Sequence, residues 1–194
     1  TGTLTEGRPT FEQAIPAGNI SADEVLRLAA SLDQGSEHPL AHAIVEAARE
    51  RSLPLSVVHE FESDSGIGVR GEVDAKRLVL GNTALMQQEG VDTAAMTEAA
   101  DSLRAKGASV MFLAVDSRLM GLLAVSDPVK KSTPEAVKDL QNAGIRVIMA
   151  TGDGVATAHA VAQQLNIDEV YGEVKPADKL DLVTRLQSEG RIVA

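Results

Sequence analysis

The sequence predicts an α/β protein in two parts, an antiparallel α+β part followed by a parallel α/β part. Up to about residue 126, amphipathic helical patterns mix with short strands joined by tight turns. This mixture is typical of an antiparallel sheet with helices packed against it. After Asp127-Pro128 helices and strands alternate, which is typical of a parallel sheet with helices on both sides. The boundary between the parts is predicted near residues 120–128.

Composition limits the classes of function. The chain has 194 residues, of which 44% are hydrophobic, enough for one large domain or two small ones. A net charge of −10 and an aromatic content of 2% argue against general nucleic-acid binding. The chain has no cysteine, which excludes disulfides and thiolate metal sites. We find no apolar run long enough to cross a membrane and no signal peptide, so the chain is expected to be soluble.

Three amphipathic helices are predicted in the first part. Ser21 followed by Glu24 is a capping-box pattern, and Pro39 opens the second helix at its first position. The third helix is predicted over 92–106 and ends at Gly107. The inward-facing residues of the three helices are Val25, Leu28, Ala29 and Leu32; Leu40, Ile44, Ala47 and Ala48; and Met96, Ala99 and Leu103.

Five strands are predicted around these helices. They span residues 57–62, about 67–74, 77–81, 108–116 and 118–126. A turn at Asp74-Ala75 joins the second strand to the third, and a turn around Ser117 joins the last two. This order predicts an antiparallel sheet with the helices packed against it.

The second part alternates regularly. The predicted elements are helix 133–143, strand 145–151, helix 154–165, strand 169–173, helix 177–188 and an incipient strand at 191–194. The strand "IRVIMAT" is predicted to be buried on both faces because it is almost continuously apolar. Ligands of parallel sheets bind beyond the carboxyl ends of the strands. The stretch Thr151-Gly152-Asp153-Gly154 lies at such an end.

Two patterns could hold phosphate or approach a ligand with the backbone. The TGDG stretch precedes a helix and suits a phosphate, although a simple N-cap turn at Thr151 or Asp153 explains it as well. Lys179 stands in the first turn of the next helix, where a cation is unfavourable unless an anion binds nearby. The stretch 66–71 matches G-x-G-x-x-G, but the predicted hairpin after it contradicts a dinucleotide fold. These glycines either shape a strand entry or let a ligand approach the backbone.

The stretch "SEHPLAH" raises three interpretations. Glu37 and His38 could cap the helix that begins at Pro39, could form a metal site with His42, or could bind a ligand. Because the zincin order of His and Glu is absent, the spacing of His38 and His42 gives little support to a metal site. His42 is expected to be exposed, and we predict no metal site in the chain.

Seven short motifs follow one another along the chain: "TGTLTEG", "SEHP", "GIGVRG", Gly81-Asn82, "SDPVK", "TGD" and "KPADK". Together they resemble the motifs of the heavy-metal (type IB) P-type ATPases, most closely those of pumps that export copper(I) or silver. "TGTLTEG" resembles the tail of the phosphorylation motif D-K-T-G-T-L-T, and "SDPVK", "TGD" and "KPADK" resemble the D-P, T-G-D and P-x-x-K motifs. "SEHP", "GIGVRG" and Gly81-Asn82 resemble the nucleotide-binding set of the type IB pumps. The resemblance covers essentially the whole chain.

The resemblance implies the fold, the ligands and the roles of the site residues. It implies a haloacid-dehalogenase-like Rossmannoid phosphorylation domain (1–8 and 126–194) with an inserted α+β nucleotide-binding domain (9–125). ATP and Mg²⁺ are the implied cofactors. Glu37 and His38 would contact the adenine region, Gly66 and Gly68 would let the backbone approach the nucleotide, and Gly81 and Asn82 would complete the pocket. Thr1 and Thr3 would line the phosphorylation loop. Thr151 and Gly152, with Asp153 of the same motif, would hold the phosphoryl group, and Lys179 would offset its charge.

The resemblance also implies a larger protein. The partners would be the membrane helices and the actuator domain of the same pump, with this region on the cytoplasmic face and the transported ion bound elsewhere. The family's nucleophilic Asp would lie two residues before Thr1, and its G-D-G-x-N-D segment soon after Ala194. We therefore expect the 194 residues alone to bind ATP without forming the aspartyl-phosphate.

Three other interpretations stay open at the level of the sequence. The first is a zinc or cadmium exporter with the same cytoplasmic motifs. The second is a soluble haloacid-dehalogenase phosphatase with a large cap, and the third is a non-enzymatic nucleotide sensor.

Overall fold

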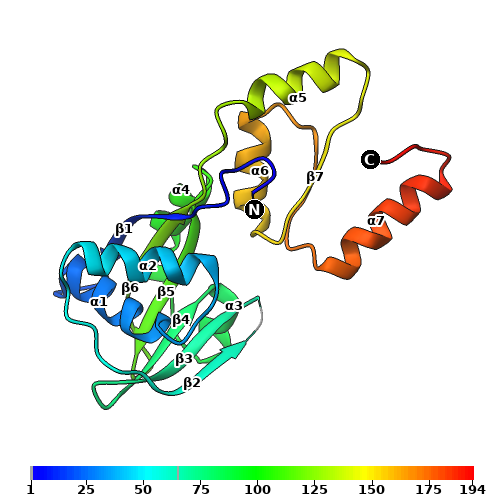
Figure 1. The fold of residues 1–194 in the computed structure, drawn as a ribbon. Coiled ribbons are helices and arrows are strands. Elements are labelled where there is room, and N and C mark those ends of the chain that lie inside the picture. Colours follow the sequence, from blue (N-terminus) through cyan, green and yellow to red (C-terminus); the bar gives the residue numbers. More distant parts are fainter. Residues whose placement is uncertain (1, 65) are drawn as a thin grey trace.

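Six strands form one antiparallel sheet in the computed structural model, which describes residues 2–64 and 66–194 (Figure 1). Their order is β1-β6-β5-β4-β3-β2, so the first strand pairs with the last and the others follow in reverse. The β3–β4 and β5–β6 turns each place two residues at positive φ, as in two-residue hairpins of type I′. The strands are β1 (Thr10–Pro16), β2 (His59–Asp64), β3 (Gly68–Val73), β4 (Lys76–Gly81), β5 (Ser109–Val115) and β6 (Arg118–Ser126).

Helices cover both faces of this sheet. On one side lie α1 (Ala22–Asp33) and α2 (Pro39–Glu50), and on the other lie α3 (Thr83–Gln88), η1 (Ala94–Met96) and α4 (Thr97–Arg104). Successive side chains of a strand point to opposite faces. Leu78 and Leu80 therefore join the core under α1 and α2, while Val79 joins the core under α3 and α4. This two-sided burial explains why the central strands read as continuous apolar runs.

The second part is a smaller parallel α/β unit. Strands β7 (Ile148–Ala150) and β8 (Glu169–Tyr171) pair in parallel, and the crossover between them contains α6 (Val155–Gln164). Helices α5 (Thr133–Asn142) and α7 (Pro176–Ser188) flank this unit in the chain. A separate apolar cluster fills it, made of Val137, Met149, Ala158, Val161, Ala162, Leu165 and Ile167.

Two chain segments that run side by side connect the two parts. Thr5 forms an antiparallel bridge with Val129, and its Oγ1 donates a hydrogen bond of 2.6 Å to Asp127 Oδ2. The parts also touch through α6, where the buried Thr157 Oγ1 donates a hydrogen bond of 2.9 Å to the carbonyl oxygen of Ala108. The chain thus enters and leaves the larger part at the same place beside the smaller part.

Several elements differ from the sequence prediction. The helix predicted over 92–106 begins as the 3₁₀ turn η1, because Asp92 Oδ1 accepts from the Ala94 amide and tightens the first turn. The strand predicted over 145–151 is paired only over β7, and only Met149 and Thr151 in it are buried, so its expected burial on both faces is wrong. Residues 191–194 form no strand. Strand β1 and helix α3 were not predicted.

Within the described ranges, none of the helices has the length and apolar character that a membrane crossing requires. The predicted fold class, an antiparallel sheet with flanking helices joined to a parallel α/β unit, is confirmed by the model.

Candidate functional site

Gly68 and Gly81 lie where β3 and β4 leave no room for side chains. They pair directly across β3 and β4. A Cβ on Gly68 would lie 2.3 Å from the Leu80 carbonyl oxygen, and a Cβ on Gly81 would lie 2.3 Å from that of Ile67. Both glycines are therefore required by the packing of the strands, whatever ligand binds beside them.

Gly66 and Asn82 complete this corner of the sheet. Gly66 has a φ of +82° and open space where a Cβ would stand. Asn82 caps α3 by accepting from the Leu85 amide at 3.1 Å, and its Nδ2 donates to the Gly66 carbonyl oxygen at 3.2 Å. The structure thus brings together four predicted residues, Gly66, Gly68, Gly81 and Asn82, which we call the glycine corner.

Glu37 and His38 lie exposed at the start of α2. His38 is the N-cap residue, and its Nδ1 accepts from the Leu40 amide at 3.2 Å. A neutral imidazole with Nδ1 as acceptor carries its proton on Nε2, so Nε2 is left as a donor for another partner. The capping interpretation is confirmed, and it leaves ligand binding by the rest of the ring open. His42 is exposed, as expected.

The turn that carries these two residues rests on β2, the strand paired with β3. A Cβ on Gly35 would lie 2.7 Å from the ring of Phe61, so the turn and this strand are in direct contact. Phe61 lies three residues before Asp64, which pairs with Gly68. At about 3.3 Å per residue, about 10 Å of strand separates Phe61, where the turn touches β2, from Asp64, which pairs with Gly68.

Asp33 belongs to the same turn but was not singled out from the sequence. Its side chain is 4% exposed, and its Oδ2 has no hydrogen-bond partner among the described residues. Burial raises the pKa of this carboxyl to about 7. A signal was available in the sequence, because Asp33 follows Ala29 and Ala30 on the apolar face of α1, at the helix end where negative charge is unfavourable.

Thr151 and Asp153 form a compact turn between β7 and α6. Thr151 Oγ1 donates to Asp153 Oδ2 at 2.6 Å and accepts from the Asp153 amide at 3.2 Å. Helix α6 begins at Gly154 without a side-chain cap, so the interpretation of this turn as a simple N-cap is wrong. Gly152 is exposed beside the uncapped helix start, where free amides favour an anion.

The other predicted phosphate-site residues are less closely placed. Thr3 is exposed, in a segment held by the Lys130 Nζ bond to the Gly2 carbonyl oxygen at 2.7 Å. Lys179 is exposed in the first turn of α7. Within residues 2–64 and 66–194, neither Thr3 nor Lys179 hydrogen-bonds to Thr151 or Asp153. Thr1 lies outside the described residues.

The described residues do not supply a metal centre by themselves. Across the described ranges, no group of three or more His, Cys, Asp or Glu side chains is placed to hold a metal ion. Asp153, the acidic residue nearest the predicted phosphate site, is already engaged with Thr151.

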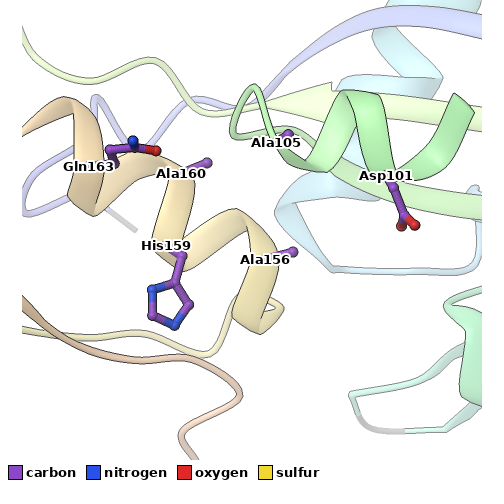
Figure 2. A pocket seen from close by; sticks show the side chains of 6 residues that line it. All are labelled: Asp101, Ala105, Ala156, His159, Ala160 and Gln163. Atoms are coloured by element: carbon purple, nitrogen blue, oxygen red, sulfur yellow. The ribbon is translucent and has the colours of Figure 1, made fainter. Parts of the chain in front are cut away.

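A hollow between α4 and α6 lies apart from all of these residues (Figure 2). It has a volume of about 280 Å³, and the small side chains Ala156 and Ala160 point from α6 toward α4. Its polar lining consists of Asp101, His159 and Gln163. The hollow therefore belongs to the contact between the two parts and contains no predicted site residue.

The family model for haloacid dehalogenase-like hydrolases matches residues 1–194, and the chain belongs to this family. Along all 194 residues, it is 50% identical to a copper-exporting P-type ATPase of Legionella pneumophila and covers 26% of that protein. It is 44% identical to a silver exporting P-type ATPase of Salmonella typhimurium and covers 24% of it. The chain thus spans about a quarter of the length of the curated relatives that it matches.

Solved structures agree with these relatives. The catalytic domain of a CPx-ATPase superposes with a TM-score of 0.71 at 26% identity, covering 98% of this chain and 65% of that one. A zinc-transporting PIB-type ATPase in its E2.Pi state superposes with a TM-score of 0.69 at 29% identity, covering 97% of this chain and 30% of that one. The predicted resemblance to heavy-metal P-type ATPases, including copper and silver exporters, is confirmed.

Proposed function

We propose that the chain is the cytoplasmic ATP-binding and phosphorylation region of a heavy-metal P-type ATPase. Residues 9–125 would be the nucleotide-binding domain, inserted into a phosphorylation domain made of 1–8 and 126–194. The paired segments at Thr5 and Val129 support this division, because they bring the two ends of the insertion together. The membrane helices and the actuator domain of the same pump would be its partners.

ATP would bind between the Gly35–His38 turn and the glycine corner. The observation that carries this proposal is the seating of that turn on Phe61, in the strand that pairs with Gly68. His38 would offer its Nε2 and its ring face to the adenine, and Glu37 would accept hydrogen bonds from donors such as the exocyclic amino group. Gly66 has room for close approach of the sugar or the phosphates to the backbone.

The phosphoryl group would be held at the start of α6. Thr151 and Gly152 would bind its oxygens, since the hydroxyl and the free amides of the helix start favour an anion. The Thr151 hydroxyl donates its proton to Asp153 in the structure, and it would turn to the phosphoryl oxygen when that group binds. Lys179 and Thr3 would reach this group from α7 and from the N-terminal segment. Mg²⁺ is implied by the family, but the described residues offer it no site, so we derive no step through it.

The transported ion would be copper(I), bound in membrane helices outside this chain. The copper- and silver-exporting relatives are 50% and 44% identical to the chain, whereas the zinc-transporting structure is 29% identical. That structure nevertheless keeps zinc or cadmium export as the second candidate, since it superposes over 97% of the chain.

Calorimetric titration with ATP tests the nucleotide site through two substitutions of His38. His38→Ala should weaken ATP binding by about 1–2 kcal/mol, the scale of a lost hydrogen bond with partial stacking. It should also cost about 1 kcal/mol of stability, because the N-cap of α2 is lost. His38→Asn keeps a capping side chain, so it should restore the stability but not the affinity.

The outcomes separate the possible roles of His38. If the parent chain binds no ATP, the proposed site is wrong. If it binds ATP and both variants bind equally well, His38 serves only as the cap of α2.

A further inference from the structure

Phe61 contacts the backbone of Gly35 with no room for a side chain between them. A Cβ on Gly35 would lie 2.7 Å from both Cγ and Cδ2 of the ring and 3.1 Å from Cδ1. These similar distances place the Gly35 backbone over the ring near Cγ. Phe61 is one of only three phenylalanines in the chain.

A β-bulge directs Phe61 toward this turn. The register of β2 against β3 shifts between His59 and Glu62, and Glu60 adopts a φ of +49°. A bulge changes the direction in which the neighbouring side chains point. The strand opposite accommodates it with Gly71, where a Cβ would lie 3.0 Å from Val58 Cγ2 and 3.1 Å from the His59 carbonyl oxygen.

The turn above the ring has short-range hydrogen bonds and one bond to the loop before β2. The Ser36 amide donates to the Asp33 carbonyl oxygen at 3.0 Å, and the His38 amide donates to Ser36 Oγ at 3.2 Å. Gln34 Nε2 donates to the Ser56 carbonyl oxygen at 2.8 Å. The short-range bonds fix the shape of the turn but not its distance from the sheet. The contact between Gly35 and Phe61 links the turn to the sheet directly.

We propose that Phe61 is a positioning residue of the nucleotide site. Through Gly35, its ring sets the position of Glu37 and His38 relative to the glycine corner, and so the width of the space that the nucleotide occupies. This inference rests on the proposed ATP-binding function. A positioning role predicts that Phe61 and Gly35 are coupled in ATP affinity, which a residue that only fills the core does not predict.

A double-mutant cycle tests this coupling. Gly35→Ala forces the new methyl group against the ring and should weaken ATP binding about tenfold. Phe61→Ala should weaken it severalfold. The double variant should bind ATP at least about threefold more tightly than the sum of the two single effects predicts, because alanine lacks the Cγ and Cδ atoms that the methyl group would meet.

Phe11→Ala is the matched control. Phe11 is also a partly buried phenylalanine packed against the core under α1 and α2, but it lies on β1. Its replacement should lower the urea midpoint as Phe61→Ala does, and should leave ATP affinity unchanged. If Gly35→Ala does not fold, the comparison of Phe61→Ala with Phe11→Ala decides by itself.

The outcomes distinguish the positioning role of Phe61 from the proposed ATP-binding function on which it rests. Equal ATP affinity of Phe61→Ala, Phe11→Ala and the parent overturns the positioning role and leaves the ATP site standing. Additive effects of Gly35→Ala and Phe61→Ala on affinity overturn it as well. Failure of the parent to bind ATP overturns the proposed function, and the inference with it.

Discussion

Replacing Asp33 by Asn should stabilise the chain in a way that depends on pH. Burial raises the pKa of Asp33 from 3.8 to about 7. The folded state therefore holds a proton that the unfolded chain releases, and the free energy of unfolding falls as the pH rises from about 4 to about 7. At about 1.4 kcal/mol for each tenfold change in proton affinity, the ionised carboxylate costs about 4 kcal/mol at pH values above 7. Asn is close in shape to the protonated acid and avoids this cost.

Urea unfolding at about pH 5 and about pH 8 measures the difference between Asp33→Asn and the parent. Far-UV circular dichroism is the suitable signal, because the chain has no tryptophan and one tyrosine. The comparison is made at each pH because Glu24 acts in the opposite sense, its pKa being lowered by its hydrogen bond to Arg27. Asp23→Asn, in the exposed first turn of α1, is the control. A gain in stability that is the same at both pH values would refute the reasoning, since it would mean that Asp33 is not protonated in the folded state.

Two further changes test other contacts. Thr157→Val keeps the shape of the side chain but leaves the buried Ala108 carbonyl oxygen without its partner, so it should lower stability by about 1–3 kcal/mol. Thr157→Ser keeps the hydroxyl and should not lower it. Equal urea midpoints for the two variants would contradict this contact between the two parts. Gly66→Ala and Gly90→Ala both place alanine at positive φ in open space and should each cost about 1 kcal/mol of stability. Only Gly66→Ala should weaken ATP binding in calorimetry, and equal affinities would argue against a close approach of the nucleotide to Gly66.

The sequence predicted well those elements whose signals are local. The start of α2 at Pro39 and the hairpin turns at Asp74-Ala75 and Ser117 depend on residues within a few positions, and all were located. Strand β1 was missed because it has few apolar residues, a register shift near Gln13, and a partner strand far away in the chain. Helix α3 was missed because six residues are too short for a helical period to be visible.

The candidate site divides in a similar way. Motifs identified Gly66, Gly68, Gly81 and Asn82, but their mutual packing depends on how β3 and β4 pair. Sequence could not decide which of these glycines is free for a ligand. In the structure Gly66 lies beside open space, whereas the neighbouring strand leaves no room for a side chain on Gly68 or Gly81.

The paired segments at Thr5 and Val129 have a consequence for the order of folding. The hydrogen bond from Thr5 to Asp127 joins residues 122 positions apart. Closing a flexible loop of that length costs about 4 kcal/mol of chain entropy. Once β1 pairs with β6, however, Thr10 stands opposite Ser126 and the two ends already meet. The smaller parallel part then assembles as if its two chain segments were close in sequence. Its folding therefore depends on the larger antiparallel part having folded first.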